Sequence, residues 1–175
     1  MSYTRRGICA LLAALTIACG GSVDAPAAEF DAARAMQRVE EQLAFGPRIP
    51  GTAGHAAMAA WLDSLARAGS DSVIVQSWTH VAANGDSVPM VNVIARFNPA
   101  APRRIAYLAH WDTRPASDGP ASRDHSAPVP GANDGASGVA VLLGVMDALG
   151  ANRPPAGLGV DLVFVDGEDF GEFGP

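Results

Sequence analysis

The sequence predicts an α/β fold, specifically a three-layer sandwich built on a mixed, mostly parallel central sheet. Two apolar segments, at 105–109 and 160–165, have the length and composition of buried strands, and polar residues follow each of them closely. Segments with helical spacing of apolar residues lie before and between them and supply the helices. Because ligands of open α/β sheets bind at the carboxyl ends of the strands, the polar residues there predict a ligand crevice.

The amino-terminal segment 1–19 resembles a bacterial export signal, with two arginines before an apolar run that ends at Cys19. Its last five residues resemble a lipoprotein cleavage box, which predicts a lipid anchor on Cys19; an ordinary cleaved signal is the alternative. Both interpretations predict an exported protein that is periplasmic or membrane-anchored. Residues 20–30, rich in Gly, Ser, Ala and Pro, are expected to link this segment to a single domain at 31–175.

The composition excludes several functional classes. All twelve cationic residues are arginines, so a lysine Schiff base or a Ser-Lys pair is impossible. The formal net charge of −6 and the lack of a basic patch argue against nucleic acid as a partner. Both cysteines, Cys9 and Cys19, lie in the export segment, which excludes thiolate zinc sites and cysteine nucleophiles from the domain.

Apolar spacing predicts two helices at the start of the domain. The first covers 31–45 with Asp31 as its cap, and the second covers 55–68 and ends at Gly69. The Gly/Pro-rich segment 46–52 separates them as a loop.

Segments typical of strands follow at 72–78 and 90–97, and the Asn84-Gly85 pair between them predicts a hairpin. A strand is predicted at 105–109, a helix at 136–149 and a last strand at 160–165. The segment 114–130 between the first two is a loop whose length is typical of functional or disordered segments.

The last strand is predominantly apolar, which is typical of a central parallel strand covered on both faces. Flanking elements are expected after such a strand, but the sequence ends soon afterwards at Pro175. We therefore expect an amino-terminal fragment of a larger domain, with a sheet that is incomplete on its C-terminal side.

One histidine and four acids near the ends of these segments are of the donor types found in zinc sites. Without thiolates, Zn²⁺ binds neutral imidazole and carboxylates at about 2.0 to 2.2 Å. His110 is a candidate ligand, and Asp112 is placed to orient its ring through the other ring nitrogen. Asp134, in a glycine-bounded turn, has two oxygens that can bridge two ions. Of the adjacent acids after the last strand, Asp169 is a candidate ligand of a second ion and Glu168 a candidate base.

Three ordered motifs resemble those of the superfamily of zinc-dependent aminopeptidases and glutaminyl cyclases: 109–112, 131–138 and 164–169. The resemblance extends from about Phe45 to the end of the chain. It implies a partial zinc peptidase-like catalytic domain at 31–175 that acts on the N-termini of peptides or proteins.

The resemblance also implies a role for each candidate residue. His110 is implied to bind the first zinc ion, Asp134 to bridge the first and second ions, and Asp169 to bind the second. Glu168 is implied to be the general acid/base, and Asp112 the carboxylate behind the histidine. A cis peptide bond is implied directly after Asp134.

The sequence departs from this superfamily in two respects. Asp169 stands where many relatives have Glu, and relatives supply a further acid and a last His from beyond the acidic pair. Because part of the ligand set is absent, we expect the chain alone to bind zinc weakly and to turn over poorly.

The expected reaction is hydrolysis of the N-terminal peptide bond, with Glu168 moving the proton. The first alternative is a glutaminyl cyclase, in which Glu168 takes a proton from the substrate amine as that amine attacks its own γ-amide. The Thr-Arg-Pro at 113–115 favours cyclase-like relatives. The second alternative is a truncated exported domain without catalytic function; the sequence leaves the number of ions and the oligomeric state open.

Each candidate also has a purely structural interpretation. His110 alone would be a strand-end histidine, Asp134 a helix cap or Asx turn, and the acidic pair a solvated loop, but their ordered combination favours a site. Ser137 lacks the Gly-x-Ser-x-Gly elbow, so a serine hydrolase is a weak alternative. Trp111 is interpreted as a packing residue. The other histidines are interpreted as surface or loop residues: His55, His80 and His125.

Overall fold

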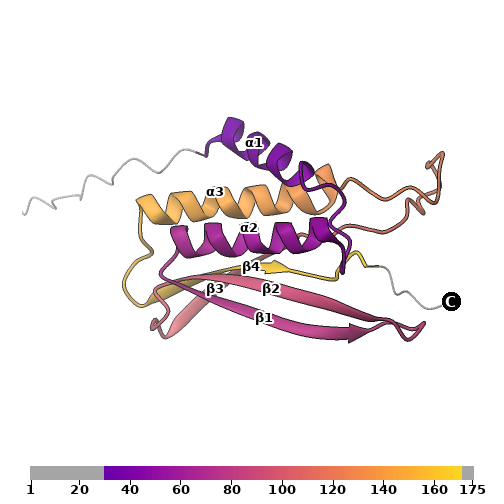
Figure 1. Ribbon diagram of the computed structural model, residues 1–175. Helices are drawn as coiled ribbons and strands as arrows, with labels where there is room; N and C mark the ends of the chain where they lie inside the picture. Colours follow the sequence, from indigo (N-terminus) through magenta and orange to yellow (C-terminus); the bar gives the residue numbers. More distant parts are fainter. Residues whose placement is uncertain (1–29, 171–175) are drawn as a thin grey trace, which may run out of the picture.

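The computed structural model describes residues 30–170, and Figure 1 shows its three helices stacked on one side of a four-stranded sheet. The predicted export signal and Cys19 lie outside the described residues. The helices are α1 (Ala32–Leu43), α2 (Ala53–Gly69) and α3 (Gly138–Ala151). The strands are β1 (Ser72–Val81), β2 (Ser87–Phe97), β3 (Arg103–His110) and β4 (Leu158–Val165). A short π-helical turn, η1 (Ala132–Ser137), leads into α3.

Side-chain caps begin the first two helices. Asp31 Oδ1 accepts a hydrogen bond from the backbone N–H of Arg34 at 2.9 Å, as predicted. Thr52 Oγ1 accepts one from the backbone N–H of His55 at 3.3 Å. Each cap satisfies a donor that the start of a helix leaves unpaired. The two predicted helices are confirmed, with small differences at their ends.

The strands lie in the order β1-β2-β4-β3. β1 and β2 form the predicted antiparallel hairpin, whose turn contains Gly85 at φ 89°. β2 pairs antiparallel with β4, and β4 pairs parallel with β3. The α/β class and the mixed sheet are confirmed. The described part of the sheet is mostly antiparallel rather than mostly parallel, because β2 pairs antiparallel with β4 as well as with its hairpin partner β1.

The hydrophobic core lies between the sheet and the pair α2 and α3. Alternate residues of β2 and β4 point toward these helices, as expected for a strand with one face against the core. Burying each large apolar side chain contributes about 1.5 to 3 kcal/mol. Residues 132–151 are apolar and long enough to cross a membrane, but in Figure 1 α3 lies between α1 and the sheet as a core helix. The completely buried core residues include Met58, Leu62, Ala95, Phe97, Leu143, Leu162 and Phe164.

The described helices cover only one face of the sheet. On the opposite face, four apolar side chains lie in register across the strands: Ile74, Ile94, Val163 and Leu108. Ile74 is 41% exposed and Leu108 is 63% exposed. The third layer of the predicted sandwich is therefore not formed within residues 30–170.

Candidate metal centre

The parallel pairing of β3 and β4 brings two of the predicted segments together. His110, the last residue of β3, lies opposite Val165, the last residue of β4. Asp112 follows the first strand, and Glu168 and Asp169 follow the second. Parallel neighbours release the chain at the same edge of a sheet, so these polar residues meet there as predicted.

The η1 turn brings Asp134 to the same edge. Gly131, at φ 68°, and Gly135, at φ 94°, bend the backbone in a region where other residues are strained. A Cβ on Gly131 would lie 2.4 Å from the Thr113 side chain, and one on Gly135 would lie 3.0 Å from the carbonyl oxygen of Asp112. The two glycines therefore allow the turn to close against the chain that leaves β3.

The predicted cis peptide after Asp134 is wrong. Residues 30–170 contain no cis peptide bond. Asp134 itself takes extended angles (φ −89°, ψ 103°), and the positive φ of Gly135 reverses the chain direction instead.

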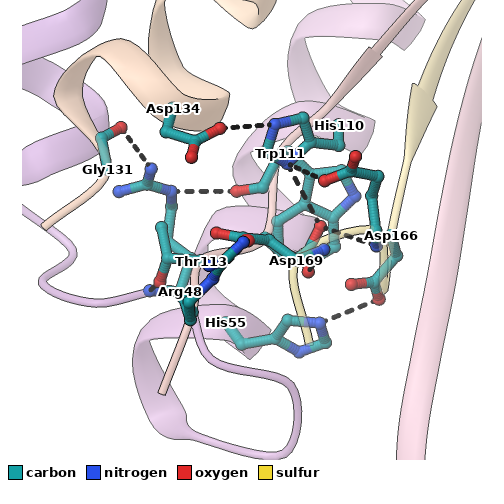
Figure 2. A network of polar contacts seen from close by, with 12 residues as sticks. Arg48, His55, His110, Trp111, Thr113, Gly131, Asp134, Asp166 and Asp169 are labelled. Atoms are coloured by element: carbon teal, nitrogen blue, oxygen red, sulfur yellow. Dashed lines mark hydrogen bonds and ion pairs between the residues drawn. The ribbon is translucent and has the colours of Figure 1, made fainter. Parts of the chain in front are cut away.

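His110 faces an acid from each of its ring nitrogens, as Figure 2 shows for Asp134. Nε2 lies 3.1 Å from Asp134 Oδ1, whereas Nδ1 lies 3.5 Å from Asp112 Oδ1 and 3.8 Å from Glu168 Oε2. The interaction with Asp112 raises the pKa of His110 from 6.5 to about 9; burial opposes this shift, and the charges of Glu168 and Asp134 support it. Without a bound cation, the ring therefore carries a proton at neutral pH.

Asp112 is completely buried and connects the two strand ends. Its Oδ1 accepts a hydrogen bond from the backbone N–H of Glu168 at 3.2 Å, and its Oδ2 accepts one from the N–H of Asp169 at 2.9 Å. The side chains of Glu168 and Asp134 are 64% and 58% exposed. Both carboxylates are thus accessible to a ligand, and they lie next to the His110 ring, whose Nδ1 faces the buried Asp112.

Asp169 does not join the His110–Asp134 pair in this structure. Its Oδ1 accepts hydrogen bonds from Arg114 Nε at 2.8 Å and Nη2 at 2.5 Å. Arg114 also donates to Asp118 in the long loop, and these two acids raise the pKa of the guanidinium. Within residues 30–170, no group of three or more His, Cys, Asp or Glu side chains is arranged to hold an ion. The role of Asp169 as a ligand stays a prediction.

The interpretation of His55 as a surface or loop residue is wrong. His55 is 4% exposed on α2, and its Nε2 lies 2.8 Å from Asp166 Oδ2. Its ring stacks on Trp111 with centroids 4.4 Å apart, while Asp166 also accepts a hydrogen bond from the backbone N–H of Val91 at 2.6 Å. The available sequence signal was the position of His55 on the apolar face of its helix. Its acidic partner is 111 residues away and was not visible in local spacing.

The other aromatic predictions have simpler outcomes. Trp111 is completely buried, which confirms its interpretation as a packing residue. His80 lies half-buried on β1 with its ring nearly perpendicular to that of Phe170. His125 is exposed in the long loop, as predicted.

Arg48 is a further buried residue at this edge, and the sequence pattern gave no indication of it. Its guanidinium donates to the backbone carbonyls of Trp111, Pro130 and Gly131. Burial lowers the pKa of Arg48, and the charge of Asp112 partly offsets this effect. A single arginine in a Gly/Pro-rich loop carries no periodicity or motif from which such contacts follow.

Comparisons with known proteins agree with this geometry. Residues 92–174 match the sequence profile of peptidase family M28. The fold is similar to a glutaminyl cyclase from Bacteroides thetaiotaomicron, with 39% identity and a TM-score of 0.78 over 84% of this chain and 51% of that one. A leucine aminopeptidase precursor from the same organism gives 38% identity and a TM-score of 0.79 over 85% and 52%.

A Zn-dependent exopeptidase from Parabacteroides distasonis is similar too, with 38% identity and a TM-score of 0.78 over 85% of this chain and 51% of that one. The chain is similar in sequence and fold to the superfamily of zinc-dependent exopeptidases and glutaminyl cyclases. It spans about half the length of these structures. A search of curated protein sequences found no match.

This superfamily implies zinc, and the site can be tested for its fit to that ion. Two donors at about 2.0 to 2.1 Å from one tetrahedral Zn²⁺ lie roughly 3.3 Å apart. His110 Nε2 and Asp134 Oδ1 are 3.1 Å apart, which is close to that spacing. Histidines that bind metals usually present the other ring nitrogen to a carboxylate, as His110 does to Asp112. His110 and Asp134 therefore fit a shared ion, whereas Asp169 has Oδ1 paired with Arg114 and only Oδ2 without a hydrogen-bond partner.

Proposed function

We propose that the complete protein is a zinc-dependent enzyme that acts on the N-termini of peptides or proteins. The main support is the 3.1 Å approach of His110 Nε2 to Asp134 Oδ1, with Asp112 behind the ring. His110 and Asp134 would hold one ion, and Asp169 would add a ligand if Arg114 releases it. When bound, the ion supplies a Lewis acid that polarises the substrate carbonyl.

The first candidate reaction is hydrolysis of the N-terminal peptide bond. Glu168 suits the acid/base role because its carboxylate is 64% exposed and lies 3.8 Å from the His110 ring. It would take a proton from the attacking water and return it to the leaving amine. Asp112 supports this role by accepting the backbone N–H of Glu168, which fixes the position of that residue.

The second candidate reaction is cyclisation of an N-terminal glutamine, and the pairing of Arg114 with Asp169 favours it. Aminopeptidases commonly use two ions, and a second ion needs a free carboxylate. Arg114 binds Asp169 Oδ1 at 2.5 and 2.8 Å, so a second ion would have to compete with a cation for this carboxylate, of which Oδ2 alone has no hydrogen-bond partner. Cyclisation requires no activated water, because the α-amine of the substrate attacks the γ-amide and ammonia leaves. Glu168 would carry the proton from the amine to the leaving group.

One experiment separates the candidates. An aminoacyl-nitroanilide and a peptide with an N-terminal glutamine are each incubated with the zinc-loaded protein, with and without a chelator. Chelator-sensitive release of nitroaniline supports the peptidase, and chelator-sensitive release of ammonia supports the cyclase. Absence of both products from the complete protein would contradict the proposal and favour a domain without catalytic function.

We also propose that the protein is exported and carries a lipid anchor on Cys19. The support is the sequence of residues 1–19 alone. Detergent phase partition of the expressed protein, compared with a Cys19→Ser variant, tests the anchor. Equal partition of both forms into the aqueous phase would contradict it.

A further inference from the structure

Arg48 occupies an unusual environment next to the candidate metal centre. The residue is completely buried, and its three guanidinium nitrogens donate to three different backbone carbonyls. Nε donates to Trp111 at 2.9 Å, Nη1 to Pro130 at 3.0 Å, and Nη2 to Gly131 at 2.8 Å. Figure 2 shows the guanidinium between the carbonyls of Trp111 and Gly131.

The carbonyls that Arg48 binds belong to the two segments that carry the candidate ligands. Trp111 directly follows His110, and Gly131 lies at the start of the turn that presents Asp134. The backbone of Arg48 adds a second connection to the first segment. Its N–H donates to Thr113 Oγ1 at 2.8 Å, and its carbonyl accepts the N–H of Thr113 at 3.2 Å. One residue therefore links the end of β3 to the η1 turn.

Stability alone does not explain a charge at this position. Moving an ion out of water costs several kcal/mol, and apolar residues of similar volume often serve a buried site at least as well. Among the described residues, no carboxylate forms an ion pair with Arg48, so backbone carbonyls and the nearby Asp112 compensate its charge. A guanidinium does offer donors in a rigid planar fork, which fixes the separation of the groups it binds.

We propose that Arg48 is a positioning residue for the metal centre. By holding Trp111 and Gly131 at a fixed separation, it keeps His110 Nε2 and Asp134 Oδ1 at the spacing that one ion requires. The inference rests on the proposed function in that these two side chains share a zinc ion. Arg48 itself binds neither the ion nor the substrate.

The test compares Arg48→Lys with Arg38→Lys. Arg38 is a matched control, because it is also buried, at 4% exposure, but its guanidinium contacts Asp147 between α1 and α3. Zinc affinity is measured by competition with a chromogenic chelator, the ligand field by the visible spectrum of the Co²⁺-loaded protein, and stability by thermal unfolding.

We expect Arg48→Lys to weaken zinc binding by roughly 10- to 100-fold and to change the Co²⁺ spectrum. Substitutions of residues that orient metal ligands typically have effects of this size on metal affinity. Arg38→Lys should lower the unfolding temperature but leave zinc affinity and the Co²⁺ spectrum at wild-type values. Wild-type zinc affinity and spectrum in Arg48→Lys would overturn the inference, and so would an equal loss of affinity in both variants. If the wild-type protein binds neither metal, the proposed function fails and the positioning role fails with it.

A second pair of variants covers the case in which Arg48→Lys does not fold. Thr113→Val removes the hydroxyl that accepts the Arg48 N–H, whereas Thr113→Ser keeps it. We expect weaker zinc binding in Thr113→Val and near wild-type binding in Thr113→Ser. Equal zinc affinity in these two variants would overturn the inference.

Discussion

Four of the acids at the carboxyl edge of the sheet form two pairs that differ in exposure. The side chains of Asp112 and Asp166 are completely buried, and each accepts a backbone N–H and faces a histidine. The side chains of Asp134 and Glu168 are 58% and 64% exposed and have few protein partners. We call the first pair the inner acids and the second pair the outer acids. We infer from this difference that the inner acids maintain the geometry of the edge, and we propose that the outer acids perform its chemistry.

The largest loss of stability is expected from Asp112→Ala. This change leaves the backbone N–H groups of Glu168 and Asp169 without their acceptor inside the protein. We expect the free energy of unfolding in urea to fall by roughly 3 to 5 kcal/mol. Asp112→Ala should also weaken zinc binding, because Asp112 faces His110 Nδ1, whereas the control Asp161→Ala, which removes the partner of Arg96 and Arg104, should leave zinc affinity unchanged. A loss below about 1 kcal/mol in Asp112→Ala would contradict the role of the inner acids.

A smaller loss is expected from Asp166→Asn. Asp166 Oδ2 makes both the contact with His55 and the one with the backbone N–H of Val91, so the substitution keeps an acceptor there but removes the charge and places an N–H₂ group where the buried Oδ1 has no partner. We expect the free energy of unfolding to fall by about 1 to 3 kcal/mol in the same assay. Asp86→Asn in the exposed hairpin turn is the control and should change it by at most about 0.5 kcal/mol. Equal losses of unfolding free energy in Asp166→Asn and Asp86→Asn would contradict the role of Asp166 as an inner acid.

The contact between an inner acid and His110 predicts a pH dependence in the metal-free protein. Because the folded pKa of His110 is raised from 6.5 to about 9, its contribution to stability is complete below pH 6.5 and is lost as the pH rises through 9. Thermal unfolding in chelator from pH 6 to 10 should therefore show a decline over this window that His110→Gln lacks. The same decline in both proteins would contradict this assignment.

The smallest effect on stability is expected from an outer acid. Glu168→Gln should change the free energy of unfolding by at most about 0.5 kcal/mol, because the side chain is mostly exposed. In the active complete protein, the same substitution should lower kcat by roughly 10²- to 10⁴-fold, since the amide cannot carry the proton. Glu40→Gln, an exposed acid on α1, should leave kcat unchanged. Unchanged turnover in Glu168→Gln would remove this residue from the proposed mechanism.

The sequence predicted those parts of the site that depend on local order along the chain. His110, Asp112, Asp134 and Glu168 were grouped because strand ends and a glycine-bounded turn meet at one edge of an α/β sheet, and the structure brings them together. His110, however, contacts its two acids through different ring nitrogens, a detail that follows only from the packed side chains.

Long-range contacts could not be predicted in this way. Arg48 donates to carbonyls up to 83 residues away, and His55 contacts Asp166, which is 111 residues away. The periodicity of the sequence therefore indicates neither contact. The pairing of Arg114 with Asp169 was missed for the same reason, because the two residues are 55 positions apart in the sequence. The parallel order of the sheet was overestimated because the antiparallel pairing of β2 with β4 has no local signal.

The central claim is that His110 and Asp134 share one ion, and a double-mutant cycle of zinc affinity tests it most directly. Zinc binding to the wild-type protein, His110→Ala, Asp134→Ala and the double variant is measured by chelator competition at neutral pH. We predict that each single substitution weakens binding by at least about tenfold, and that the double variant is much less impaired than the product of the two single effects. Wild-type affinity in either single variant, or fully multiplicative losses in the double variant, would contradict the claim.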